Sequence, residues 1–379
     1  MGLNDISTDF PEAKRTSYLS TASIGLVPEP VIEKTSIFSI EMDRGGTKAL
    51  DEEKEVLIYD GLRNEGAKLL GCAMEDIAVF NSVSEALNSV LWSLELSEGK
   101  IISTGIEFPS VTYPCLRIAQ KEKGISAVLL QAVDWQVRIE DIINEIDETT
   151  KAVVISHVEF LTGQEHDLRQ ITRYAHNSGA VVIVDGIQAA GYVPLDMREL
   201  EVDVYITGSY KWLCAPFGTA IAYISRKLSD TLTPVFVGWR SAKDMWNFNP
   251  VELRYASTAM KFEYSTSAYG VKLGLVESIK YLRKIGIENI NTHDMKLVKL
   301  LKEELMQIEG VDIITPENHG SIITFKINGK DSKEIGDRLK NLERPVELTI
   351  RQNMIRISPH FYNTEADIMH VVNSLKQAI

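Results

Sequence analysis

An apolar run that ends in an acidic residue constrains the fold of this chain more than any other feature. Residues 180–184 are all apolar, and Asp185 follows them directly. A short run of this kind predicts a strand that is buried on both faces, as in a parallel sheet covered by helices. Lys211 comes after the next strand-like run, residues 204–207, and small and aromatic residues flank it. This order places an acid and a lysine at the same edge of one sheet.

Strand-like and helical patterns alternate along the first two thirds of the chain. The predicted strands are residues 77–80, 100–104, 127–130, 152–156, 180–184, 204–207 and 220–224. Such alternation predicts βαβ units and a mostly parallel sheet with helices on both faces. Ligands of these sheets bind beyond the carboxyl ends of the strands, which is where Asp185 and Lys211 lie.

The pattern changes after about residue 258. Helices are predicted over residues 268–284, 290–307 and 333–341 and from residue 365, with strands at 311–314, 322–327, 347–350 and 354–358. We therefore expect three parts. Residues 1–25 form an N-terminal segment that packs with the small domain, residues 26–257 form a large α/β domain, and residues 258–379 form a smaller α+β domain.

Composition and charge argue against several classes of protein. The net charge of −13 disfavours nucleic acid or an acidic membrane surface as the main partner. Three scattered cysteines do not make a disulfide framework or a metal site, so a reducing cytoplasm is expected. No basic stretch precedes an apolar one at the N-terminus, and no apolar run approaches the about 18 residues of a membrane span.

The residues after the first predicted strand form a helix start. Ser82 and Glu85 have the spacing of a capping box, and apolar residues recur after them at helical spacing. A helix N-terminus presents free N–H groups and the positive end of the helix dipole, which suits a phosphate. The amides of Val83 and Ser84 and the Ser84 hydroxyl are the candidate donors. A plain helix cap is the alternative.

An acid, a lysine and a phosphate site at one sheet edge match pyridoxal 5′-phosphate (PLP). Lys211 would hold the aldehyde as a Schiff base, and Asp185 would keep the ring nitrogen protonated, so that the ring accepts electrons from a substrate carbanion. Apolar surroundings lower the pKa of a lysine, which favours imine formation and proton transfer. Ser209 and Tyr210 could donate to the phosphate, and Gln188 could bond the ring oxygen. Asp185 as a turn cap and Gln188 as a helix-start residue are the alternatives.

The segments 184–188 (Val-Asp-Gly-Ile-Gln) and 208–213 (Gly-Ser-Tyr-Lys-Trp-Leu) resemble the class V aminotransferase family of fold-type I PLP-dependent enzymes. That family includes cysteine desulfurases, kynureninase and isopenicillin N epimerase. The likeness covers nearly the whole chain, from Tyr18 to the C-terminus. It implies an α/β fold with a mostly parallel mixed sheet in a large domain, a smaller α+β domain, and a homodimer whose active sites lie at the subunit interface.

The resemblance also assigns roles to single residues. Lys211 matches the Schiff-base lysine, Asp185 the acid at the ring nitrogen and Gln188 the glutamine near the ring hydroxyl. Val83 stands where the family usually has a threonine, so only its backbone amide can serve beside Ser84. A further residue, Phe108, matches the aromatic ring that stacks on the cofactor, with ordinary core packing as the alternative.

Two more residues follow from the resemblance. Thr266 matches a threonine that reaches the phosphate of the neighbouring subunit, and a helix N-cap is the alternative for it. Arg356 matches the arginine that binds the substrate α-carboxylate, a role that suits its two-pronged guanidinium group. Because Arg356 alternates with isoleucines, a solvent-facing strand position is the alternative.

The reaction is less constrained than the cofactor. Desulfurases of the family need a mobile cysteine ahead of the carboxylate-binding arginine, and residues 343–355 contain none. Phe108 and Tyr210 are kynureninase-like. We predict an aminotransferase that acts on an amino acid or small amine. A lyase or an amino-acid epimerase of the same family is the alternative, and a PLP-binding protein without turnover is the third hypothesis.

Overall fold

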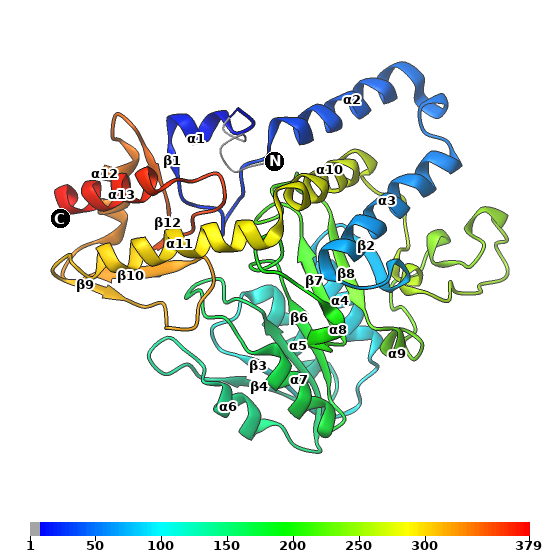
Figure 1. Ribbon diagram of the computed structural model, residues 1–379. Coiled ribbons are helices and arrows are strands. Elements are labelled where there is room, and N and C mark those ends of the chain that lie inside the picture. The colour runs from blue at the N-terminus through cyan, green and yellow to red at the C-terminus, as the bar shows by residue number, and fades with distance from the viewer. Residues whose placement is uncertain (1–7) are drawn as a thin grey trace.

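The computed structural model describes residues 8–379. A sheet of seven strands, in the order β2-β8-β7-β6-β5-β3-β4, forms the centre of the larger part (Figure 1). All its strands are parallel except β8, which runs antiparallel to β2 and β7. The seven predicted strands are present, with ends that differ by up to three residues: β2 Ile77–Phe80, β3 Glu98–Thr104, β4 Gly124–Leu130, β5 Thr150–Ser156, β6 Val181–Asp185, β7 Val204–Gly208 and β8 Ala220–Ile224.

Helices cover both faces of this sheet and form two separate cores. Val182 and Val184 of β6 pack in the core beneath α3 (Glu52–Leu70), α7 (Leu168–Asn177) and α10 (Tyr269–Ile285). Ile183 points the other way, into the core with α4 (Val83–Ser93) and α5 (Pro109–Lys121). All three side chains are fully buried, because successive residues of a strand face opposite sides of the sheet. The wholly apolar run therefore arises from the two cores, as predicted.

The C-terminal elements surround a second sheet of four antiparallel strands, in the order β12-β13-β10-β9. These strands are β9 Val311–Ile313, β10 Ile323–Ile327, β12 Thr349–Arg351 and β13 Met354–Ile357. The predicted strand 347–350 is divided, since β11 (Val346–Glu347) instead pairs in parallel with β1 (Ser17–Tyr18). The helices here are α11 Ile287–Leu305, α12 Ser332–Lys340 and α13 Glu365–Ala378.

The remaining α-helices lie before β2 or follow strands of the large sheet. They are α1 Pro11–Arg15, α2 Glu29–Gly45, α6 Ile139–Glu145, α8 Met197–Leu200 and α9 Arg226–Ser229. The α10 helix packs against α2 and α3 and continues closely into α11, which lies along the smaller sheet (Figure 1). The division into residues 1–25, 26–257 and 258–379 stays a prediction.

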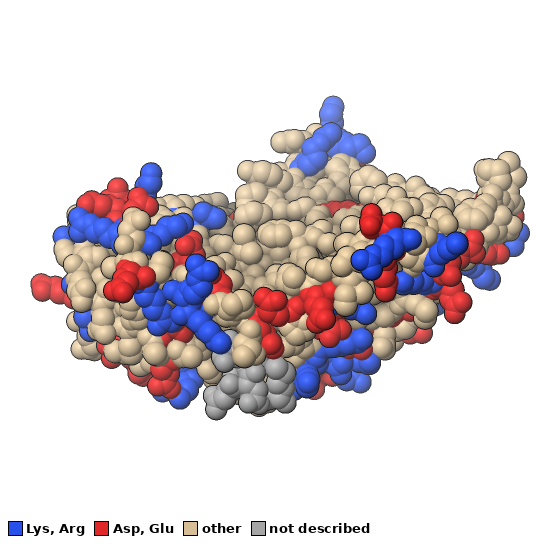
Figure 2. Space-filling view, turned by 90° about the horizontal axis from the view of Figure 1, so that it is seen from above, with Lys and Arg blue, Asp and Glu red and all other residues tan. Residues whose placement is uncertain are grey.

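One face of the molecule carries charged side chains of both signs. On the face seen from above, Lys and Arg side chains are interspersed with Asp and Glu around a broad area without charged groups (Figure 2). Within residues 8–379, no helix is long and apolar enough to cross a membrane.

A close backbone contact at Gly186 gives the first testable prediction. A Cβ atom at this position would lie 2.1 Å from Cε1 of Tyr205, a fully buried ring. We expect Gly186→Ala to lower the free energy of unfolding by about 1–3 kcal/mol or more, as overpacking does. Gly61→Ala is the matched control, because its new Cβ would lie 3.9 Å from Val276 in an ordinary contact. In the helix α3 that change should be neutral or stabilising by up to about 1 kcal/mol. Urea unfolding curves of both variants measure the difference.

Candidate active site

A pocket at the carboxyl edge of the large sheet collects most of the predicted site residues. Asp185 is the last residue of β6, and Lys211 follows the end of β7. Of the predicted residues, only Ser209, Thr266 and Arg356 are absent from the lining of this pocket. The lining consists of Ser82, Val83, Ser84, Phe108, Ser110, Ser156, Phe160, Asp185, Ile187, Gln188, Tyr210 and Lys211.

Asp185 is a buried carboxylate that faces this pocket. It is 3% exposed, and its Oδ1 accepts a hydrogen bond from the backbone N–H of Ile187 at 2.9 Å. Burial raises the pKa of Asp185 to about 6, while that hydrogen bond and the charge of Lys211 act in the opposite direction. The group is therefore an acid whose ionised form needs a cationic neighbour.

Lys211 lies on the same pocket, between aromatic rings. Its Nζ is 5.8 Å from the ring centroids of both Phe108 and Tyr210. Burial lowers the pKa of Lys211 to about 8; Asp185 opposes this shift, and the charges of Arg356 and Arg351 add to it. At neutral pH, a larger fraction of this amine is unprotonated than of an ordinary lysine, which is what a nucleophile or base requires.

The N-terminal segment holds the lysine loop in place. The backbone N–H of Gly25 donates to the carbonyl of Tyr210 at 2.8 Å. A Cβ atom on Gly25 would lie 2.0 Å from the carbonyl oxygen of Lys211, so only glycine allows this approach. Residues near the start of the chain therefore support the site built by the sheet.

Gln188 is fixed beside Asp185 by two hydrogen bonds. Its Nε2 donates to the carbonyl of Ala22 at 3.0 Å, and its Oε1 accepts from the indole N–H of Trp212 at 2.8 Å. One N–H of the amide remains for a ligand. Gln188 starts no helix, so that alternative is wrong.

The N-terminus of α4 opens into the pocket. Ser82 caps this helix, because its hydroxyl accepts from the backbone N–H of Glu85 at 3.1 Å. The reciprocal half of the predicted capping box is wrong: the Glu85 carboxylate accepts from the N–H of Asn81 at 2.8 Å instead. The Ser84 and Ser110 hydroxyls are hydrogen-bonded to each other at 2.7 Å. Val83 and Ser84, the first residues of α4, therefore line the pocket at a helix N-terminus, the kind of place that suits an anion.

Phe108 is exposed in the pocket and is not core filler. It is 46% exposed, and its ring meets Phe160 edge-on, with centroids 5.3 Å apart and planes at 80°. Tyr210 is half-buried and stacks on Phe217 with centroids 4.4 Å apart. By contrast, Ser209 is fully buried, and its hydroxyl donates to the carbonyl of Pro216 rather than into the pocket.

Arg356 on β13 lies against this pocket from the side of the smaller sheet. It is 2% exposed, so the solvent-facing alternative is wrong. The guanidinium donates to the carbonyl of Phe160 and to the hydroxyl of Ser23, whereas its buried Nε has no partner. Burial lowers the pKa of Arg356 to about 10. Among residues 8–379, no acidic side chain forms an ion pair with it.

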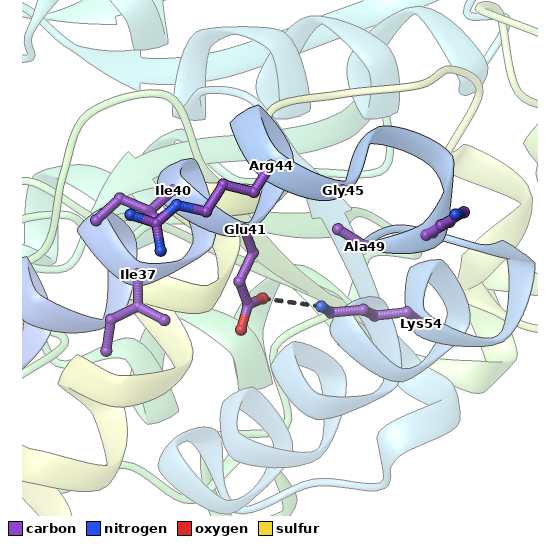
Figure 3. Close-up of a pocket in the computed structure, with 8 residues that line it drawn as sticks. Ile37, Ile40, Glu41, Arg44, Gly45, Ala49 and Lys54 are labelled. Carbon is purple, nitrogen blue, oxygen red and sulfur yellow. Dashed lines mark hydrogen bonds and ion pairs between the residues drawn. The ribbon is translucent and has the colours of Figure 1, made fainter.

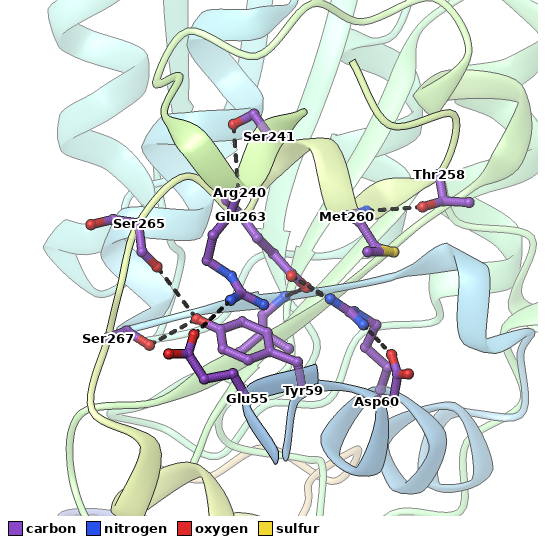
Figure 4. A network of polar contacts seen from close by, with 12 residues as sticks. Glu55, Tyr59, Asp60, Arg240, Ser241, Thr258, Met260, Glu263, Ser265 and Ser267 are labelled. Carbon is purple, nitrogen blue, oxygen red and sulfur yellow. Dashed lines mark hydrogen bonds and ion pairs between the residues drawn. The ribbon is translucent and has the colours of Figure 1, made fainter. Parts of the chain in front are cut away.

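Thr266 is exposed and does not reach the pocket of its own chain. Ala268, not Thr266, occupies the N-cap position of α10, so that alternative is wrong. A buried polar network fixes the start of this segment (Figure 4). In it, Arg63 donates through Nε and Nη2 to the carboxylate of Glu263, and Tyr59 bonds the hydroxyl of Ser267 at 2.9 Å.

The pair of Arg63 and Glu263 gives a second prediction. Both side chains are 2% exposed, and Glu263→Gln leaves the buried Arg63 with the partly exposed carboxylate of Asp60 as its remaining charged partner. The expected loss of unfolding free energy is about 1–3 kcal/mol, the cost of weakening a buried, charged hydrogen-bond pair. The control, Glu334→Gln, breaks the exposed pair with Arg338, whose side chains are 64% and 57% exposed, and should cost less than about 1 kcal/mol. Equal losses in the two variants, measured by denaturant unfolding, would contradict this assignment.

Two further buried acids, Glu107 and Glu159, were not assigned a role from the sequence. Glu107 accepts from the backbone N–H and hydroxyl of Ser156, and Glu159 accepts from Thr104 at 3.1 Å and lies 3.2 Å from Nε2 of His166. Burial raises the pKa of Glu107 well above its usual range and that of Glu159 to about 8. An acid soon after each of two neighbouring parallel strands is the signal that could have revealed this pair.

The raised pKa of Glu159 predicts a pH-dependent stability. Between its unfolded pKa near 4.5 and about 8, the folded protein holds a proton that the unfolded chain has lost. This group therefore stabilises the fold less as pH rises through that window. Glu159→Gln stays neutral throughout, so its melting temperature should rise relative to the original protein from pH 5 to pH 8. A constant difference across these pH values, measured by calorimetry, would exclude a protonated Glu159.

A second hollow lies between α2 and α3 and contains none of the predicted residues. Ile37, Ile40 and Arg44 line it, and Lys54 pairs with Glu41 at 3.0 Å across it (Figure 3). In the part of the chain that the structure describes, no group of three or more His, Cys, Asp or Glu side chains could hold a metal ion. The acid and lysine pocket is thus the candidate active site.

Comparisons with known proteins support this reading. The family described as "Aminotransferase class-V" matches residues 17–371. An uncharacterised aminotransferase, YcbU, of Bacillus subtilis is 26% identical over 97% of this chain and 95% of its own length. A probable cysteine desulfurase of Methanothermobacter thermautotrophicus is 27% identical over 100% of this chain and 98% of its own length.

Solved structures are also similar. The cysteine desulfurase CsdA of Escherichia coli superposes with a TM-score of 0.88 at 22% identity, over 100% of this chain and 98% of that one. The cystine C–S lyase C-DES, solved with cysteine persulfide, has a TM-score of 0.88 at 24% identity, over 97% of this chain and 99% of that one. These likenesses show the fold.

The chain therefore belongs to the class V aminotransferase family, a family of PLP-dependent enzymes. This membership confirms the predicted family, cofactor and fold-type I architecture. The roles of the single site residues, the reaction and the subunit assembly stay proposals.

Proposed function

We propose that this enzyme is a PLP-dependent lyase that cleaves the carbon–sulfur bond of a β-substituted amino acid. Relatives named as desulfurases support a lyase over the aminotransferase that we predicted from the sequence. The C–S lyase C-DES, with the same fold, supports sulfur as the leaving atom.

The residues of the pocket fit PLP by their chemistry. The first amides of α4 suit its phosphate, the exposed ring of Phe108 suits its aromatic face, and the buried carboxylate of Asp185 suits its ring nitrogen. Lys211 lines the same pocket and suits its aldehyde. Buried Asp185 in particular needs a cationic neighbour, and a protonated ring nitrogen provides one. When bound, PLP supplies an electron sink for negative charge at the substrate Cα.

The side chains of this enzyme then bind the substrate and transfer a proton. Arg356 binds the substrate α-carboxylate, to which its unpartnered Nε can donate. Lys211, with its lowered pKa, removes the proton from Cα. The bond between Cβ and sulfur breaks, and sulfur leaves with the electron pair. With cystine and one water, the balanced products are pyruvate, ammonia and cysteine persulfide.

One observation carries this proposal: the hairpin before Arg356 has no cysteine and no room for a mobile loop. β12 and β13 are joined by Gln352 and Asn353 alone. The three cysteines of the chain lie elsewhere, and both Cys115 and Cys214 are fully buried. Burial raises the pKa of the Cys214 thiol, so it is a poor acceptor of sulfur. Sulfur therefore leaves on the product and not on the protein.

A second candidate is the aminotransferase activity that we first predicted. The likeness to YcbU, itself named an aminotransferase, favours it. The two differ in the fate of the substrate: a lyase releases pyruvate and a sulfur compound, whereas an aminotransferase passes the amino group to an added 2-oxo acid.

We also propose that the enzyme is a homodimer. Thr266 is exposed and lies outside the pocket of its own chain, although the segment before it is firmly held. A second copy of the chain would place this hydroxyl near the phosphate.

The proposed lyase is tested with PLP-loaded enzyme and cystine, by measuring pyruvate and persulfide. Lys211→Ala should lose the visible absorption of bound PLP and lower turnover more than about a hundredfold. A triple variant, Cys72→Ala with Cys115→Ala and Cys214→Ala, is the control and should keep its turnover.

Loss of turnover in the folded triple variant would mean that sulfur passes through a protein cysteine. Amino transfer to a 2-oxo acid without pyruvate from cystine would favour the aminotransferase. Unchanged turnover in Lys211→Ala would contradict the role of Lys211 as the PLP-binding lysine and base.

A further inference from the structure

A second arginine, Arg351, lies on the same face of the β12–β13 hairpin as Arg356. In this antiparallel pair, Thr349 is opposite Arg356 and Arg351 is opposite Met354. Opposed residues share a face, as do residues two apart on one strand. Arg351 and Arg356 are therefore diagonal neighbours, a relation that separates Cα atoms by about 7–8 Å.

This shared face adjoins the candidate active site. The Thr349 hydroxyl bonds that of Ser23 at 2.8 Å, and Ser23 in turn accepts from Arg356. Met354, opposite Arg351, packs in a small apolar cluster with Phe160, whose ring lines the pocket. The charges of both arginines act on Lys211, and that of Arg351 also acts on Arg356.

The hairpin holds Arg351 on a short, defined turn. Gln352 and Asn353 have φ values of 49° and 57°, which suits a tight two-residue connection between strands. Asn353 is tied to the start of α12, because its side chain and its carbonyl both accept hydrogen bonds from Ser332. The base of the Arg351 side chain is therefore positioned by the sheet and not by a mobile loop.

The guanidinium of Arg351 forms few polar contacts with the rest of the chain. It is exposed, and it donates to the carbonyl of Ile350 at 3.2 Å. In the described part of the chain, residues 8–379, no carboxylate forms an ion pair with it. Two arginines thus stand side by side without an acid in a protein of net charge −13. In the proposed function, the substrate α-carboxylate pairs with Arg356. A second anionic group beside Arg351 would then relieve the remaining repulsion between the two guanidinium groups.

Building on the proposed function, we propose that Arg351 binds a second carboxylate of the substrate, on the far side of the scissile carbon–sulfur bond. The preferred substrates are then amino acids whose sulfur leaving group carries a carboxylate, as the cysteine persulfide released from cystine does. Arg356 holds one end of the substrate and Arg351 the other, so the bond to be broken lies between two fixed anchors. A planar guanidinium pairs with a carboxylate in a defined orientation, which suits this task.

Two substrates that differ only in charge test the inference. S-carboxymethylcysteine carries the second carboxylate, and S-carbamoylmethylcysteine has a neutral amide in its place. The original PLP-loaded enzyme should favour the carboxylate in kcat/KM. Arg351→Gln should raise KM for the carboxylate about five- to tenfold and change KM for the amide by less than about twofold. Arg338→Gln, an exposed arginine on α12, is the control and should leave both KM values unchanged.

The outcomes separate this inference from the lyase itself. If the enzyme cleaves neither these compounds nor cystine, the lyase proposal fails, and binding of both compounds to the PLP-loaded enzyme, measured by calorimetry, still tests Arg351. If the original enzyme binds and cleaves both compounds equally well, the Arg351 inference fails while the lyase stands. An equal change for both compounds in Arg351→Gln also overturns it. So does a variant that alters subunit assembly but not the preference, since Arg351 would then face a second copy of the chain.

Discussion

The electrostatic attraction between the buried Asp185 and the buried Lys211 is the interaction on which the site depends. Removal from water destabilises the charged form of each group, while the opposite charge of the other partly restores it. This balance exists only because β6 and β7 end side by side, each held between two apolar cores. The chemistry of the pocket is thus a consequence of the parallel sheet.

Most of the fold could be predicted from the sequence because its strongest signals are local. The run 180–184 is apolar at every position because both faces of this strand are covered by apolar cores. The bounds of short strands were harder to predict from the sequence. The segment 347–350 is divided between β11 and β12, because the partner of β11 is β1, more than three hundred residues away in the chain. Pairing over such a distance leaves no local trace.

The site shows the same division between local and long-range information. Asp185, Lys211 and the α4 N-terminus each lie at or just after the end of a strand and could be placed at one edge of the sheet. The orientation of single polar groups could not: the Ser209 hydroxyl meets Pro216, and Glu85 meets Asn81. Arg356, alternating with isoleucines, could have faced either way. Its burial is decided by Phe160 and Ser23, which lie on other parts of the chain.

The contacts of the N-terminal segment have a consequence for biosynthesis. β1 pairs with β11, Ser20 bridges to Ser358, and Gly25 supports the lysine loop. The first two of these contacts join residues 17–20 with residues that the ribosome makes more than three hundred positions later. A nascent chain that has not yet reached residue 346 lacks the strand with which β1 pairs. It also lacks Arg356, so the contacts of this guanidinium with Ser23 and Phe160 form only after residue 356 has been added.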